Sequence, residues 1–354
     1  MPITTTAGPG SRAAPHFSAP HLNNTARTVR TGGFFLPGDP QQSDAGPWQL
    51  GPAWVQWEAP ADGAARTPWV LVHGGGGQST DWLGIEDGAP GWAPRLVDAG
   101  FPAYLLDRPG HGRSPYDPAR LGGRTGFPDY AGAGAVFAPE PAPEHAAESG
   151  PSSSHAVHSA WPWGRRPGSP ELDQLVASSS GMLTATPLSQ DLDARRIVDL
   201  LERTGPAVLA THSAGAAGGW LAAARSPHRV RGIVTFEPLG PPFRDLGPRG
   251  RLDCGLTAVP LAAGASRPLA RQEPPLGPEP LGGLPVLVVS GPASGRAGGD
   301  AETVDFLNRC GARATHLRLE DLGIHGNGHG LIFENNLNEI LEPVLEWLAG
   351  NKIT

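Results

Sequence analysis

Residues 208–215 read VLATHSAG, and residues 216–225 continue as AAGGWLAAAR. An apolar, strand-like run therefore ends at Ser213 and passes at once into an alanine-rich segment that favours a helix. A serine in such a strand-to-helix turn needs small residues two positions before and after it, because the two backbones pass closely. Thr211 and Gly215 fill these positions, with threonine where glycine is usual. The pattern predicts a nucleophile elbow, with a serine that merely starts a helix as the alternative.

A glycine-rich loop follows another buried strand, since residues 69–77 read WVLVHGGGG. Such a loop can point backbone N–H groups at an anion, so we expect an oxyanion hole here. Ala214, next to the serine, would supply one N–H, and Gly75 or a neighbouring glycine of the loop the other. A nucleotide cradle is the alternative, but the chain has neither G-x-x-x-x-G-K-[ST] nor G-x-G-x-x-G in its usual context.

A serine nucleophile needs a base, and the base needs a carboxylate to orient it. Residues 323–330 read GIHGNGHG and precede the last amphipathic segment, where we prefer His329 to His325 because it lies nearer that segment between two glycines. For the acid, the common position after the strand at 285–289 reads GPAS and offers no carboxylate. We therefore expect Glu237, at the end of the strand at 230–236, with Asp300 as the alternative.

Strand-like and helix-like runs alternate from residue 68 onward, which predicts a mostly parallel central sheet flanked by helices. We expect residues 1–30 to form a disordered leader, and residues 31–114 and 188–354 to form this core. Residues 33–58 predict an antiparallel edge hairpin. Residues 115–187 are too long for an ordinary connection and predict a cap or lid, and residues 238–283 form a second, proline-rich insertion.

Bulk properties exclude several classes of function. The chain has 354 residues and a net charge of −7, and its arginines are scattered, so nucleic acid is not an expected partner. No run approaches eighteen apolar residues, which excludes a membrane span. Residues 1–20 lack the features of a signal peptide, so we expect a cytoplasmic protein, with secretion as the alternative. Two cysteines, Cys254 and Cys310, allow one disulfide but no disulfide framework.

Other histidines do not form a recognisable site. His145, His155 and His158 lie in a Ser/Pro-rich stretch without a ligand set of usual spacing, so we expect loop histidines and neither a metal nor a cofactor. His111 lies in an early turn, which argues against a catalytic base.

The chain resembles the α/β-hydrolases, and more narrowly a small group of bacterial esterases typified by esterase 713. The resemblance covers roughly residues 30–350 and is carried by the order Ser, acid, His and by several short stretches. These are GW at 91–92, GF at 100–101, DRPGHGRS at 107–114, the long insertion, THSAG at 211–215, FEP at 236–238, GNGH at 326–329 and NN at 335–336.

This resemblance implies the α/β-hydrolase fold and a Ser–His–Glu triad of Ser213, His329 and Glu237. It also implies export and a homodimer. Adjacent cysteines stand in the group's oxyanion loop where this chain has Gly75 and Gly76, so any role of that pair does not carry over.

These observations lead us to expect a cofactor-independent serine esterase that acts on a small-molecule ester through an acyl-enzyme. Hydrolysis of another acyl or carbon–carbon bond on the same triad is one alternative. A non-catalytic binding protein that kept the fold is the other.

Overall fold

The structure is a computed structural model, and it describes residues 26–63, 66–84, 88–139, 158–261 and 280–353. Most of the expected leader, together with His145 and His155, lies outside the described residues. Parts of both insertions, residues 140–157 and 262–279, also lie outside them.

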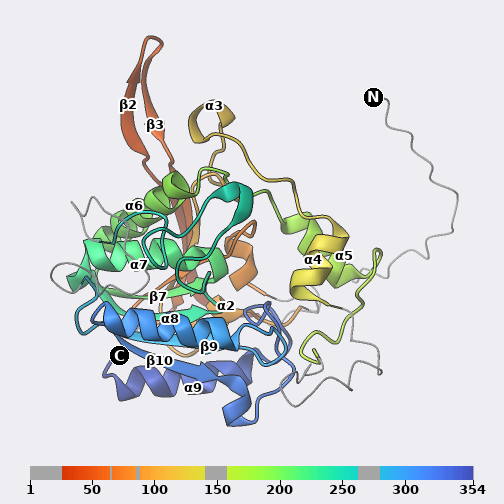
Figure 1. Cartoon of the computed structure of the whole chain (residues 1–354). Helices are drawn as coiled ribbons and strands as arrows, with labels where there is room; N and C mark the ends of the chain where they lie inside the picture. Colours follow the sequence, from red (N-terminus) through yellow and green to blue (C-terminus); the bar gives the residue numbers. More distant parts are fainter. Residues whose placement is uncertain (1–25, 64–65, 85–87, 140–157, 262–279, 354) are drawn as a thin grey trace, which may run out of the picture.

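An eight-stranded sheet forms the centre of the molecule (Figure 1). Its strands are β1 (Val29–Leu36), β4 (Ala53–Pro60), β5 (Trp69–Val72), β6 (Ala103–Asp107), β7 (Ala207–His212), β8 (Val230–Phe236), β9 (Pro285–Ser290) and β10 (Arg313–Arg318). They lie in the order β1-β4-β6-β5-β7-β8-β9-β10. β1 and β4 run antiparallel to their neighbours and the remaining pairs are parallel, which confirms the mostly parallel sheet expected from the sequence.

Helices cover both faces of this sheet. The main ones are α2 (Trp92–Asp98), α6 (Thr186–Thr204), α7 (Ala216–Arg225), α8 (Ala297–Arg309) and α9 (Leu337–Gly350). Successive residues of a strand point to opposite faces, so on β5 Val70 and Val72 join a core cluster with α6, α7 and α8. Trp69 and Leu71 join the opposite cluster with α2 and α9. This arrangement confirms the expected α/β fold.

One feature at the rim differs from the simple edge hairpin expected for residues 33–58. β1 and β4 do pair as antiparallel strands, but between them β2 (Asp39–Ser43) and β3 (Gly46–Leu50) form a separate two-stranded ribbon. Figure 1 shows this ribbon projecting away from the body of the molecule. Its strands are polar and proline-containing, so they carry little of the alternating apolar signal that predicts a strand.

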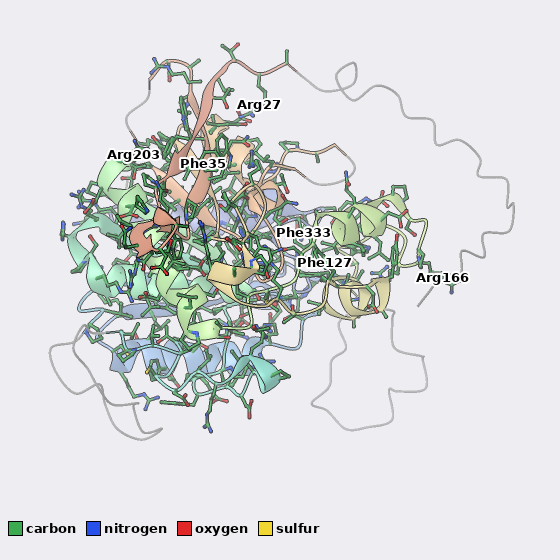
Figure 2. All side chains as sticks on the ribbon, turned by 90° about the horizontal axis from the view of Figure 1, so that it is seen from above. Arg27, Phe35, Phe127, Arg166, Arg203 and Phe333 are labelled. Carbon is green, nitrogen blue, oxygen red and sulfur yellow. The ribbon has the colours of Figure 1, made fainter. Side chains whose placement is uncertain are left out.

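The described residues of the first insertion form three short helices, α3 (Pro118–Leu121), α4 (Tyr130–Phe137) and α5 (Pro170–Ser178). α4 and α5 lie side by side next to the sheet domain (Figure 1). Exposed Phe127 and half-buried Phe333 lie on this same side of the molecule (Figure 2). None of the described helices is both long and apolar enough to cross a membrane.

Candidate active site

Ser213 lies at a strained corner at the C-terminal end of a central strand. β7 ends at His212, and Ser213 has a φ of +48°, in the left-handed region that residues other than glycine rarely adopt. The Ser213 carbonyl accepts a hydrogen bond from the Leu239 N–H at 2.9 Å, and the chain then turns into α7. This backbone has the geometry of a nucleophile elbow.

Glycines provide the room for this corner. A Cβ on Gly215 would lie 2.4 Å from the carbonyl oxygen of His73, so the position cannot carry a side chain without displacing the neighbouring strand. On the other side, a Cβ on Gly219 would lie 2.9 Å from Cγ2 of Thr211. The missing side chain of Gly219 therefore makes room for threonine where the usual motif has glycine.

His329 is the histidine that the fold brings to Ser213. Its Nε2 lies 3.1 Å from Ser213 Oγ, whereas His325 is exposed on the surface. The loop that carries His329 is held from behind by the fully buried Glu334. The Glu334 carboxylate accepts from the N–H of Gly328 at 2.9 Å and from the amide of Asn327 at 2.8 Å, and it lies 2.8 Å from His158 Nε2.

Glu237 lies on the far side of the imidazole. Its Oε2 is 2.7 Å from His329 Nδ1, and its Oε1 accepts from the Gly291 N–H at 2.9 Å. Glu237 also has a positive φ, +44°, so the end of β8 is bent sharply to bring the carboxylate under the histidine. The alternative acid, Asp300, instead accepts a hydrogen bond from Ser290 Oγ at 2.6 Å.

Burial and nearby arginines determine the electrostatics of this pair. Burial lowers the pKa of His329, and the charges of Arg296 and Arg244 lower it further. Burial raises the pKa of Glu237 to about 8, and the Ser294 hydroxyl, the Gly291 N–H and Arg296, 3.7 Å away, oppose this rise by favouring the ionised form. In the form with Glu237 ionised and accepting from Nδ1–H, Nε2 of a neutral His329 can accept the Ser213 proton.

The glycine loop after β5 packs against the elbow. A Cβ on Gly74 would lie 2.6 Å from His212 Nδ1, and one on Gly75 would lie 3.3 Å from the Cβ of Ala214 and 2.4 Å from Met182 Sδ. Gly75 and Ala214 therefore lie side by side next to Ser213. Their backbone N–H groups are the candidates for an oxyanion hole.

A cavity of about 220 Å³ opens over Ser213. Residues of the first insertion form much of its wall, among them Phe137, whose ring stacks on that of His329 with centroids 5.6 Å apart. Phe333 lies 5.4 Å from Phe137, between centroids, and also lines the cavity.

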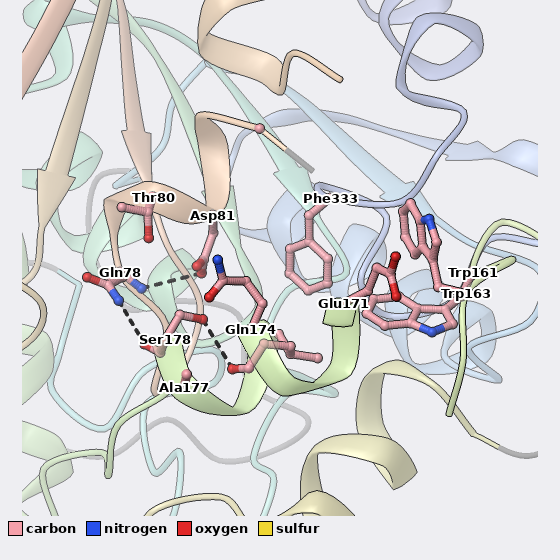
Figure 3. A pocket seen from close by; sticks show the side chains of 12 residues that line it. Gln78, Thr80, Asp81, Trp161, Trp163, Glu171, Gln174, Ala177, Ser178 and Phe333 are labelled. Atoms are coloured by element: carbon pink, nitrogen blue, oxygen red, sulfur yellow. Dashed lines mark hydrogen bonds between the residues drawn. The ribbon is translucent and has the colours of Figure 1, made fainter. Parts of the chain in front are cut away.

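A second cavity of about 370 Å³ adjoins the first (Figure 3). The two share Asp81, Leu175 and Phe333 in their walls. Figure 3 shows the Trp161 and Trp163 rings and Glu171 beside Phe333 in the second cavity. Phe333 therefore lies, with Asp81 and Leu175, between the space above Ser213 and a larger, aromatic-lined space.

Sequence analysis missed the residues that surround the histidine. Phe137 lies in the first insertion, whose sequence has no periodic pattern from which its fold could be predicted. Glu334 holds the loop that carries His329 through tertiary contacts, which the sequence does not show. One signal was available for Glu334, because an acidic residue directly after the apolar run at 331–333 is a candidate for a buried, paired charge.

The other histidines and the two cysteines considered in the sequence lie outside this arrangement of Ser213, His329 and Glu237. The expectation of a loop histidine is only partly right for His158, because its ring is buried against Glu334. His111 is buried, with Nδ1 3.2 Å from the Pro109 carbonyl oxygen. Cys254 and Cys310 are both buried free thiols. Among the described residues, no three His, Cys, Asp or Glu side chains are grouped to hold a metal ion.

The elbow serine lies at the end of a parallel strand, and loops later in the chain bring a histidine and a glutamate to it. This combination of sheet and site is typical of the α/β-hydrolases. The chain belongs to the α/β-hydrolase fold family, whose model matches residues 67–248.

Two known proteins illustrate the similarity. The chain is 30% identical over 318 residues to a protein named probable secreted lipase phiG, from Fungal sp. (strain ATCC 74256), covering 83% of this chain and 85% of that one. Its fold is similar to that of a bacterial esterase solved at atomic resolution, with a TM-score of 0.63 and 20% identity, covering 93% of this chain and 98% of that chain.

Proposed function

We propose that this protein is a serine hydrolase that cleaves carboxylic esters through an acyl-enzyme. The observation that carries the proposal is the continuous chain from Ser213 Oγ to His329 Nε2, at 3.1 Å, and from His329 Nδ1 to Glu237 Oε2, at 2.7 Å. The similarity to a protein named as a lipase supports ester cleavage as the reaction. The family's fold is consistent with a small-molecule substrate.

In the first half-reaction, Ser213 Oγ attacks the ester carbonyl carbon and its proton passes to His329 Nε2. Glu237 stabilises the imidazolium that forms, and the N–H groups of Gly75 and Ala214 stabilise the oxyanion. The tetrahedral intermediate then breaks its carbon–oxygen bond, and His329 gives the proton to the departing alcohol.

In the second half-reaction, water replaces the alcohol. His329 takes a proton from the water as it attacks the acyl-enzyme carbonyl, and returns the proton to Ser213 Oγ when the acid leaves.

We further propose that residues 115–187 act as a cap over this site. Phe137 and Met182, both within this segment, line the cavity above Ser213. Such walls would fix which acyl and alcohol groups fit. A binding protein that merely kept the fold is disfavoured, because Ser213 faces an open cavity and remains within hydrogen-bond distance of His329.

Substitution of the two buried carboxyls tests the proposed acid. We expect Glu237→Gln to lower kcat on 4-nitrophenyl acetate by roughly 10³- to 10⁴-fold, because the histidine loses the carboxylate that orients and stabilises it. Asp300→Asn is the matched control, since Asp300 bonds to Ser290 and not to His329, and should keep kcat within a few-fold. A larger loss in Asp300→Asn than in Glu237→Gln would contradict the assignment.

A further inference from the structure

The cavity over Ser213 contains a guanidinium without an acidic partner. Arg249 is half-buried in the cavity wall, and its side chain contacts Met182 Sδ from Nη1 at 3.4 Å. Within the described part of the chain, Arg249 pairs with no carboxylate, whereas Arg108 pairs with Asp193 at 2.8 Å. A partly buried cation without a counter-ion is costly unless a ligand provides one.

The backbone holds Arg249 in place. It ends the short 3-10 turn η5 (Gly247–Arg249), and its carbonyl accepts a hydrogen bond from Thr186 Oγ1 at 2.7 Å. A further backbone bond from Leu246 N–H to the Gly250 carbonyl, at 2.8 Å, closes the turn. The guanidinium is therefore presented to the cavity by a loop tied to α6, the helix that begins at Thr186.

Arg249 approaches Ser213 from the side of the oxyanion loop. Met182 Sδ lies between the two, because it contacts Arg249 and would lie 2.4 Å from a Cβ on Gly75. Ser213 also contacts His329, on whose ring that of Phe137 stacks. Because His329 must protonate the departing alcohol, the alcohol belongs on the Phe137 side and the acyl group extends toward Met182 and Arg249.

The charges around the cavity favour an anion, although the whole chain has a net charge of −7. Burial lowers the pKa of Arg249, and repulsion from Arg244 and Arg108 lowers it further, so these arginines together create a positive field. The acidic residue in the cavity wall is Asp81, and burial raises its pKa to about 7. At neutral pH, it therefore opposes this field only in part.

We propose that Arg249 binds a carboxylate at the far end of the acyl group, so that the preferred substrates are monoesters of dicarboxylic acids. This inference rests on the proposed ester hydrolysis and adds a substrate class to it. The planar guanidinium can bind both oxygens of such a carboxylate, which a lysine cannot do in the same way.

A matched pair of esters tests the proposal. Monomethyl glutarate and methyl pentanoate have acyl chains of equal length that differ by a carboxylate in place of a methyl group. Their kcat/KM values can be compared by titrating released acid. We expect the wild-type protein to prefer the charged ester by roughly tenfold, as for one charge-assisted hydrogen-bonded pair, and the preference to fall as salt is added.

Variants of two nearby arginines identify the residue responsible. Arg249→Met keeps the aliphatic stem and should abolish the preference, whereas Arg249→Lys should retain part of it. Arg251→Met is the control, because Arg251 is exposed, lies 3.9 Å from Asp253 and does not line the cavity. Melting temperatures of all variants show whether each is folded.

A second pair of esters shows whether Arg249 recognises a carboxylate on the acyl group or on the alcohol. The esters 4-(pentanoyloxy)butanoate and butyl pentanoate place the same change on the alcohol, and their ratio should not depend on Arg249. The proposal is overturned if wild type does not prefer the glutarate ester, if Arg249→Met leaves that preference unchanged, or if Arg249 affects only the alcohol pair. If wild type hydrolyses 4-nitrophenyl acetate but none of these four esters, the inference alone is overturned. If it hydrolyses neither, ester hydrolysis itself fails, and the inference falls with it.

Discussion

Two residues with strained backbones meet at the proposed catalytic centre. Ser213 and Glu237 both have positive φ values, +48° and +44°; Ser213 follows a fully buried strand, and Glu237 follows a strand in which every residue but Arg231 is buried. Strain of this kind costs of order 1–3 kcal/mol per residue and persists only where surrounding packing enforces it. Here the enforcement comes from the strands and from Gly215, whose missing side chain lets the elbow pass His73.

These residues differ in how far sequence could predict them. Ser213 lies in a local pattern, and the lack of a carboxylate at 291–294 directed attention to Glu237. Residues 291–294 still contribute to the site, because the Ser294 hydroxyl favours the ionised form of Glu237. Arg249 could not be predicted, because its place in the cavity depends on how the second insertion folds back over α6.

The charges near His329 predict how activity depends on pH. A histidine base is active in its neutral form, so a lowered pKa moves the loss of activity to more acidic solution. For the form with Glu237 ionised, we expect the titration of His329 in kcat/KM to have its midpoint below the ordinary histidine value of 6.5. Removing a nearby positive charge by Arg244→Gln should make protonation easier and move that midpoint upward.

A pH profile of kcat/KM at low ionic strength measures this shift. Arg231→Gln serves as the control, because Arg231 is exposed on β8 and does not contribute to the lowered pKa of His329. An acidic midpoint at or above 6.5 in the wild-type protein, or a downward shift in Arg244→Gln, would contradict the electrostatic account.

At the scale of elements, the loop before α9 depends on a buried acidic residue. Glu334 binds Gly328 and Asn327 next to His329, and His158 from the first insertion packs on the same carboxylate. The insertion also pairs with this loop through its backbone, from Ala160 N–H to the Gly326 carbonyl at 3.0 Å. The position of His329 is therefore set jointly by the core and the insertion.

Glu334→Leu should damage both stability and catalysis. It leaves the Gly328 N–H and the Asn327 amide buried without their acceptor, at about 1–3 kcal/mol for each. Urea unfolding and kcat measure the two effects, with Glu339→Leu on the exposed face of α9 as the control. Unchanged kcat in folded Glu334→Leu would show that the loop does not need this support.

Core elements were easier to predict than those of the rim. The strands at 69–72, 207–212, 230–236 and 285–290 are short, apolar and fully or almost fully buried, so their sequence signal is strong. The β2–β3 ribbon and helices α3 to α5 are short and contain many polar, glycine or proline residues. Their positions are set by tertiary contacts, which a periodic pattern does not record.

At the scale of the whole molecule, the insertion and the core together form two adjoining cavities of about 220 and 370 Å³. Phe333 borders both. A substrate that extends from the smaller cavity into the larger one passes the wall that Phe333 forms together with Asp81 and Leu175. Substrate length should therefore be limited by the Phe333 side chain.

Because Phe333 lies next to Phe137, on the proposed alcohol side, Phe333→Ala should join the two cavities and move the preferred chain length of alkyl pentanoates to longer alcohols. A series of esters of rising length measures the position of the maximum in kcat/KM. Phe127→Ala is the matched control, because Phe127 is 69% exposed and lines neither cavity (Figure 2). An identical length profile in wild type and Phe333→Ala would show that the ring does not divide the substrate space.

The central claim is that Ser213 is a nucleophile made reactive by His329. Incubation with a fluorophosphonate probe, followed by mass spectrometry of the labelled peptide, tests it most directly. We predict one covalent adduct, on Ser213, which disappears in Ser213→Ala and forms far more slowly in His329→Ala. An unlabelled wild-type protein, or equal labelling of Ser213→Ala, would contradict the account.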